Sequence, residues 1–257
     1  MLARRTEWVS TVLSGTKHSP FSRIKSVVAD ITADEARARG YITGNLKKDE
    51  IVKLLKRTTN PTTIYKKQKL DRDDIIDITD LDVIAWLKAE MRLMLDEELA
   101  RAILIGDGRD ASSDDKIDEE RIRPIASDDE MYAHRVTLAG PESTEEIIEL
   151  LIRARANYRG SGQPVLFTTL PFLTDMLLVK DKVGRRLYDS LDALSSALMV
   201  SKIETVEVME QHPEVVAIFV NLSDYTIGST RGGEVSMFDD FDIDYNQQKY
   251  LIETRVS

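Results

Sequence analysis

The chain has 257 residues, of which 42% are hydrophobic and 31% charged, so it can bury a sizeable core and is not a wholly disordered protein. The absence of cysteine excludes disulfides, cysteine-ligated zinc and thiol nucleophiles, and agrees with synthesis in a reducing cytoplasm. No signal peptide is visible and no apolar run approaches the roughly 20 residues that cross a bilayer, so we expect a soluble protein without a membrane partner.

The net charge of −10 is distributed unevenly along the chain. Residues 1–70 contain 15 Lys and Arg against 6 Asp and Glu, whereas residues 71–257 contain 20 against 39. The basic part could bind nucleic acid, or it could lie on the acidic body of a neighbouring copy. An unevenly charged, solvated surface is the third interpretation.

The first 22 residues predict a short helix around Trp8 and Val12, which Gly15 and Pro20 interrupt, and we interpret them as an N-terminal arm. The next fifty residues contain little apolar material. Their pattern predicts a strand over 22–31, helical fragments over 34–39 and 48–57, and an extended, lysine-rich run over 62–70. Such a segment is either a flexible loop or an arm that becomes ordered on another subunit.

The strongest predicted element is a helix over 80–105. Thr79 and Asp82 form a start resembling a capping box, and Gly106 is a plausible stop. At 1.5 Å per residue this helix would span about 39 Å, longer than a compact domain of this size needs. Its apolar residues recur every three or four positions: Leu81, Ile84, Leu87, Met91, Leu95, Leu99 and Ala102. We expect Ile84, Leu95 and Ala102 to face a sheet.

The second half alternates helices and strands. Residues 107–130 are acidic and predict a loop, and a short strand is expected over 135–138. Ser143 and Glu146 predict a capping box at the start of a helix. Further elements are strands over 163–169, 203–209 and 215–220, helices after Pro171 and over 189–198, and a hairpin of strands 234–245 and 248–256 that turns near Asn246.

Catalytic, cofactor and metal sites are not indicated, so we expect no enzyme. The three histidines, His18, His134 and His212, lie in separate segments, and the acidic residues 107–115 do not match the spacing of a calcium loop. No phosphate-binding or hydrolase motif is present. Three lysines beside Tyr65 could contact nucleic acid, but we favour acidic residues of an adjacent subunit as their partner: Lys66, Lys67 and Lys69.

Five stretches give the chain a family resemblance. They are IYKKQKLDRDDIIDITDLDVIAWLKAEMRLMLDEELARAILIGDG (64–108), SPFSRIKSVVADIT (19–32), LLKRTTNPTTIYKKQKLDRDDIIDITD (54–80), PVLFTTLPFLTDMLLVKD (164–181) and FDIDYNQQKYLIETRVS (241–257). With them the chain resembles the major capsid proteins of tailed bacteriophages and prophages, which have the Hong Kong 97-type fold. The resemblance follows nearly the whole chain in order.

The resemblance implies an α+β fold with named parts. After the N-terminal arm (1–22) come an extension loop (23–76), a peripheral domain (77–141) with its spine helix (80–105), an axial domain (142–229) and a hairpin that returns to the peripheral domain (230–257). Family members often begin with a long scaffolding region, whereas about twenty residues precede the loop here. Either a separate scaffold exists or this sequence begins downstream.

The implied function is a shell protein that self-assembles as pentamers and hexamers into an icosahedral capsid around a phage genome. Implied partners are further copies of the chain, a scaffold, a portal, a maturation protease and packaged double-stranded DNA bound without sequence specificity. The protein would be made in the bacterial host cytoplasm and reside in the virion. An encapsulin-type compartment is the nearest alternative. An acidic hydrolase or a nucleic-acid-binding protein is the alternative of another class.

Overall fold

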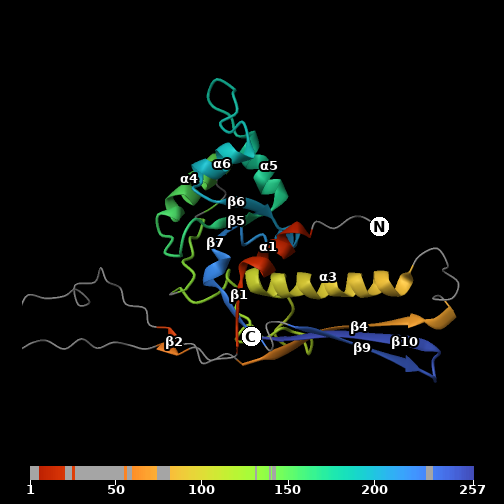
Figure 1. The fold of residues 1–257 in the computed structure, drawn as a ribbon. Helices are drawn as coiled ribbons and strands as arrows, with labels where there is room; N and C mark the ends of the chain where they lie inside the picture. The colour runs from red at the N-terminus through yellow and green to blue at the C-terminus, as the bar shows by residue number, and fades with distance from the viewer. Residues whose placement is uncertain are drawn as a thin grey trace, which may run out of the picture.

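The computed structural model describes residues 6–20, 25–26, 55–56, 60–73, 82–130, 132–138, 140, 143–229 and 234–257. Two layers make up the body (Figure 1). In the helix–sheet layer, α3 (Val83–Leu104) lies along a three-stranded sheet. The three-helix layer above it contains a second three-stranded sheet with α4, α5 and α6.

The sheet of the helix–sheet layer has the order β4-β10-β9, and both pairings are antiparallel. Its strands are β4 (Thr62–Asp71), β9 (Val235–Asp242) and β10 (Gln247–Val256). Buried and more accessible side chains alternate along β4 and β10 because one face of the sheet packs against α3. The β9–β10 hairpin confirms the predicted turn, where Asn246 has a φ of 52°.

The assignment of residues 62–71 to an extension loop is wrong. They form β4, which pairs with β10 along ten residues. Ile64 is buried in the main core, the apolar cluster in which side chains of α3 and of this sheet pack together. The extended conformation was predicted correctly, but the strand's partner lies far away in the sequence. Preceding it, β2 (Lys25–Ser26) pairs with β3 (Leu55–Lys56), so the helix predicted over 48–57 does not include residues 55–56. The helix predicted over 34–39 lies outside the described residues.

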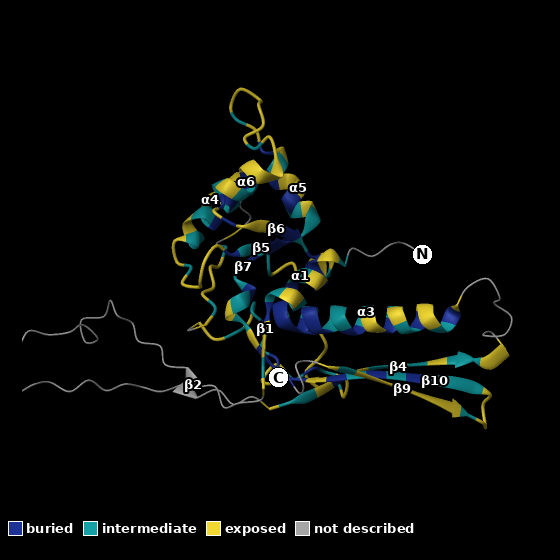
Figure 2. Ribbon diagram, in the orientation of Figure 1, coloured by how far each residue is buried: buried dark blue, intermediate teal, exposed yellow. Residues whose placement is uncertain are grey.

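Helix α3 confirms the long predicted helix with shorter bounds. Asp82 is its N-cap, and its side chain accepts a hydrogen bond from the Ala85 N–H at 3.0 Å. Thr79, which was expected to take part in this start, lies outside the described residues. Gly106, at a φ of 89°, ends the helix as predicted. Of the three side chains expected on the sheet side, Leu95 and Ala102 are buried in the main core and Ile84 is partly buried against it. Figure 2 shows burial greatest toward the C-terminal end of α3.

The N-terminal segment is part of the core, so its description as an arm is wrong for residues 7–19. In helix α1 (Glu7–Gly15), Trp8 is 1% exposed and Val12 fully buried against the main core. A side chain on Gly15 would lie 2.8 Å from Leu222, so this close approach requires glycine. Strand β1 (Lys17–Ser19) then pairs in parallel with β8 (Thr226–Gly228).

The three-helix layer has its own core and the sheet order β6-β5-β7. Its elements are α4 (Thr144–Arg155), β5 (Val165–Thr168), α5 (Leu170–Leu178), α6 (Leu191–Ala197), β6 (Lys202–Thr205) and β7 (Ala217–Val220). The capping box of Ser143 and Glu146 is confirmed. The strand predicted over 203–209 stops at Thr205 because a 3-10 helix, η2 (Glu207–Gln211), follows; η3 (Leu222–Asp224) is another. Residues 135–138 do not form the predicted strand.

Candidate assembly surface

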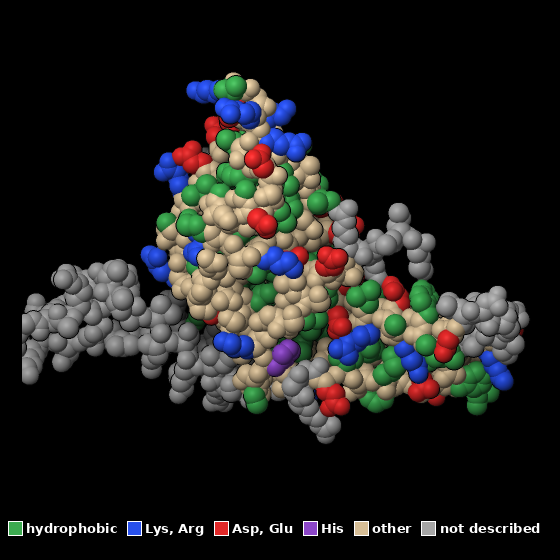
Figure 3. All heavy atoms as spheres, turned by 45° about the horizontal axis from the view of Figure 1, so that its top comes forward, with side chains coloured by type: hydrophobic (Ala, Val, Ile, Leu, Met, Phe, Trp, Pro, Cys, Tyr) green, Lys and Arg blue, Asp and Glu red, His purple; other side chains and the backbone are tan. Residues whose placement is uncertain are grey.

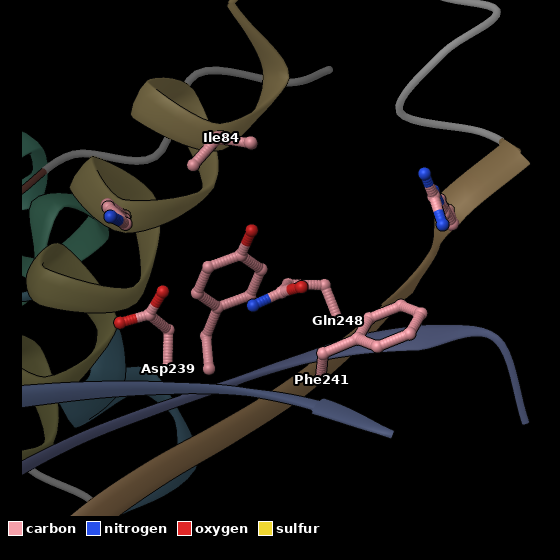
Figure 4. A pocket seen from close by; sticks show the side chains of 7 residues that line it. Ile84, Asp239, Phe241 and Gln248 are labelled. Atoms are coloured by element: carbon pink, nitrogen blue, oxygen red, sulfur yellow. The ribbon is translucent and has the colours of Figure 1, made fainter. Parts of the chain in front are cut away.

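A pocket of about 560 Å³ lies at the outer end of the helix–sheet layer, between the first turns of α3 and the sheet (Figure 4). We call it the end pocket. Side chains from α3, β9 and β10 line it together with the residue that follows β4: Arg72, Ile84, Lys88, Asp239, Phe241, Gln248 and Tyr250. The pocket is therefore formed by four segments that come together at this end of the layer.

Cations stand over the aromatic rings of the end pocket. The Arg72 guanidinium lies 5.8 Å from the centre of the Phe241 ring, and the Lys88 ammonium 5.8 Å from that of Tyr250. Burial, reinforced by the charge of Asp239, raises the pKa of Tyr250 above its usual value of 10.0. Among the described residues, neither Arg72 nor Lys88 forms an ion pair with a carboxylate. The pocket thus combines an apolar floor, two cations and the Asp239 carboxylate.

The turn of the β9–β10 hairpin, residues 243–246, projects beside the end pocket and is called the hairpin tip. Ile243 is 83% exposed and Tyr245 is 71% exposed. The tip is held by neighbouring groups: Arg72 N–H donates to the Asn246 carbonyl at 3.1 Å, and the Lys69 ammonium lies 5.9 Å from the Tyr245 ring. Next to the tip, an ion pair with Lys249 lowers the pKa of Asp242.

The face of the sheet away from α3 carries exposed aromatic and basic side chains. Tyr65, Lys67 and Lys69 alternate along β4 and are exposed, and Phe238 on β9 is exposed as well. Lys66 lies between them in the alternation, so it belongs to the other face of the sheet, and it is half-buried. The lysines that the sequence suggested as one strip are therefore divided between two faces, and only two share a face with Tyr65.

A second charged surface was missed by the sequence reasoning. Residues 180–187 form a basic hairpin, in which the Asp181 carboxylate accepts hydrogen bonds from the Val183 and Arg185 N–H groups. Figure 3 shows Lys and Arg side chains gathered at this end of the molecule. The four cations within ten residues could have signalled it: Lys180, Lys182, Arg185 and Arg186.

The groups considered for catalysis remain apart. His18 is on β1. His134 lies 3.2 Å from the Asn157 amide, and His212 lies 3.0 Å from the Glu214 carboxylate. Within the described ranges, no group of three or more His, Asp or Glu side chains is placed to hold a metal. No helix in this part of the chain is long and apolar enough to cross a membrane.

The comparisons with known proteins identify this molecule as a structural shell protein. The match of the phage capsid family to residues 9–257 then shows that the chain belongs to that family. None of the curated proteins matches the chain.

Solved capsid structures share this fold over the whole chain. The capsid of the native GTA particle is 15% identical with a TM-score of 0.67, covering 100% of this chain and 86% of the other. The Microbacterium phage Oxtober96 structure is 14% identical with a TM-score of 0.64, covering 100% and 86%. That of Mycobacterium phage Adephagia is 14% identical with a TM-score of 0.60, covering 100% and 84%. The similarity supports the expected Hong Kong 97-type α+β fold.

Proposed function

We propose that this chain self-assembles into the icosahedral capsid that encloses the double-stranded DNA genome of a tailed phage or prophage, and that it has no enzymatic activity. The observation that carries the proposal is the family match over residues 9–257. The capsid of the GTA particle was solved with C5 symmetry, which supports pentamers for this protein, with hexamers completing the shell. Further partners would be a scaffold, a portal and a maturation protease, and the assembled protein would reside in the virion after synthesis in the host cytoplasm.

In this proposal the two layers have separate roles. Residues 142–229 form the axial domain, and residues 77–141 with 230–257 form the peripheral domain around α3. Because β4 belongs to the sheet, we end the extension loop before it, at residue 61. The exposed face of the β4-β10-β9 sheet would gain a partner in a closed lattice, where each interface is repeated around the shell.

The exposed surface provides physical support. Six large apolar side chains are exposed on the two faces of the sheet and at the hairpin tip: Tyr65, Met237, Phe238, Phe241, Ile243 and Tyr245. Exposed apolar surface of this kind on a soluble protein is typical of an interaction site. Since the end pocket has one carboxylate and no histidine among its lining residues, it does not favour a hydrolase.

Electron microscopy of the protein expressed alone tests the proposal. We expect closed particles, with sedimentation showing material far larger than the 29.1 kDa chain. Expression together with neighbouring phage genes then tests the contents, because packaged DNA selects the capsid and an enclosed enzyme selects the encapsulin-type compartment. A folded protein that stays monomeric with and without those genes would contradict shell formation.

A further inference from the structure

We propose that the hairpin tip of one copy docks in the end pocket of a neighbouring copy. This inference rests on the proposed function, since only an assembling chain places two copies side by side. It assigns a partner to two features that one subunit leaves unexplained: a pocket with an apolar floor and two cations, and a projecting turn that exposes Ile243 and Tyr245. The occupant is thus a second copy of this chain.

The tip and the pocket are complementary in chemistry. The tip sequence Ile243-Asp244-Tyr245 places a carboxylate between two exposed apolar side chains. The pocket provides an apolar floor for the side chains, and its two cations, Arg72 and Lys88, outnumber its one carboxylate, Asp239, so it can take an acidic tip. Asp244 is exposed, whereas the adjacent Asp242 already pairs with Lys249. Attraction between Asp244 and the two cations offsets the cost of removing the carboxylate from water, and it distinguishes this register from one that buries Ile243 alone.

The tip cannot easily fill the pocket of its own chain, because it is fixed beside it. The hydrogen bond from Arg72 N–H to the Asn246 carbonyl ties the turn to the end of β4, and the Lys69 ammonium over the Tyr245 ring adds a second contact with β4. This fixation also favours docking between copies, since a turn that is already ordered loses little conformational entropy when it binds.

Cross-linking of single-cysteine chains provides the direct test, and the natural absence of cysteine makes it clean. One chain carries Ile243→Cys and a second, lengthened by a tag, carries Ile84→Cys. The two are mixed, assembled and oxidised. A disulfide requires the two Cα atoms to approach within about 7 Å, so a covalent heterodimer on a denaturing gel reports the tip in the pocket. Val183→Cys, 76% exposed in the basic hairpin, replaces Ile243→Cys in the control.

We expect a heterodimer from the tip variant at least about ten times more abundant than from the control, and only in assembled particles. Particles that form normally and give no heterodimer above the control would overturn the docking while leaving the proposed function intact, and would leave residues 74–81 of the same chain as the candidate occupant. If the unmodified chain formed no particles, the proposed function would fail and this contact with it.

Charge reversal gives an independent test that does not depend on cysteine geometry. Asp244→Lys should slow assembly about tenfold or more, because it places like charges together at the contact. Combining it with Arg72→Glu and Lys88→Glu in the same chain should restore much of the rate, since every copy then carries the complementary pair. Circular dichroism checks that each variant folds. An Asp244→Lys chain that folds and assembles at the normal rate would overturn the assigned register.

Discussion

At the scale of single residues, Asp107 organises a loop in which the sequence shows no periodicity. Its carboxylate is inaccessible to solvent and accepts hydrogen bonds from the Ile117 N–H at 2.7 Å and the Arg109 N–H at 3.2 Å. The side chains of Lys116 and Arg109 each lie 3.3 Å from it. The acidic segment after α3 is therefore folded around one buried, fully partnered charge.

We expect Asp107→Asn to lower the free energy of unfolding by about 1–3 kcal/mol, because a buried charged acceptor is replaced by a weaker neutral one. Thermal or chemical unfolding followed by circular dichroism measures the loss. Asp114→Asn, an exposed change in the same loop, is the control and should have little effect. An equal loss in both variants would contradict a special role for Asp107.

The pH dependence of stability should follow from the same residue. Burial alone would raise the pKa of Asp107, but the hydrogen bonds from Ile117, Arg109 and Lys116 outweigh it and hold the pKa below its usual 3.8. Its contribution is therefore complete above the unfolded pKa and is lost as the pH falls through the lower folded pKa. The difference in stability between wild type and Asp107→Asn should shrink in unfolding experiments carried from pH 6 down to acid. A constant difference would contradict the shift.

Leu95 offers the sharpest test of the α3 face. The side chain is 2% exposed, so Leu95→Ala should cost about 2–5 kcal/mol through lost burial and the cavity left behind. Arg92→Ala on the same helix removes an exposed ion pair with Asp96 and should cost less than about 1 kcal/mol. Denaturant unfolding of both variants measures these losses in the free energy of unfolding. If Leu95→Ala lowered it by less than a few tenths of a kcal/mol, this face of α3 would be wrongly assigned.

At the scale of elements, α1 behaves as an integral helix. Trp8→Ala should destabilise the protein by about 3–5 kcal/mol, because the indole is almost fully buried in the main core. Ser10→Ala, on the exposed side of the same helix, is the matched control. Near-wild-type melting of the Trp8 variant would show that α1 is dispensable, as a free arm would be.

The alternation along β4 separates two roles for its lysines. Lys67→Glu with Lys69→Glu changes the exposed face, so we expect a folded subunit whose assembly is slowed, measured by circular dichroism and light scattering. Lys17→Glu with Arg159→Glu makes the same net change at exposed sites outside this sheet and serves as the control. If both double variants slowed assembly equally, the effect would come from net charge and not from this face of the sheet.

The elements also show why prediction succeeded for some and failed for others. The periodicity of α3 and the capping box at Ser143 are local signals, and both were read correctly. The membership of β4 in a sheet depends on β10, about 180 positions later, which local patterns do not contain. The role of α1 was missed because a short amphipathic helix is equally compatible with an arm and with a core element.

At the scale of the whole molecule, the opposite charges of the two parts of the chain predict that assembly depends on salt. Exposed charges are screened over about 10 Å at 0.1 M ionic strength, so attraction between the basic first part and the acidic remainder of a neighbour should weaken as salt is added. Light scattering of wild-type assembly over a salt series measures this. Assembly that is independent of salt would contradict an electrostatic contribution, without affecting the family assignment.

The candidate assembly surface itself could not be read from the sequence. The end pocket combines Arg72, Ile84 and Phe241, which become neighbours only through the packing of α3 on a sheet built from both ends of the chain. Exposure of Ile243 is equally invisible, because an isoleucine in an alternating pattern is expected to be buried. The family could be predicted from the sequence because the resemblance follows nearly the whole chain. The residues of the assembly surface could be identified only from the tertiary structure.

The ten-residue pairing of β4 with β10 has a mechanical consequence. The segment before β4 enters the sheet at Thr62, opposite Val256, whereas β10 is joined to β9 at its other end, beyond Gln247. A pull on that segment along the strand therefore loads the ladder in shear, so its hydrogen bonds must yield together instead of opening one after another. A shell under internal pressure would have in this strand pair a joint that resists stretching between subunits.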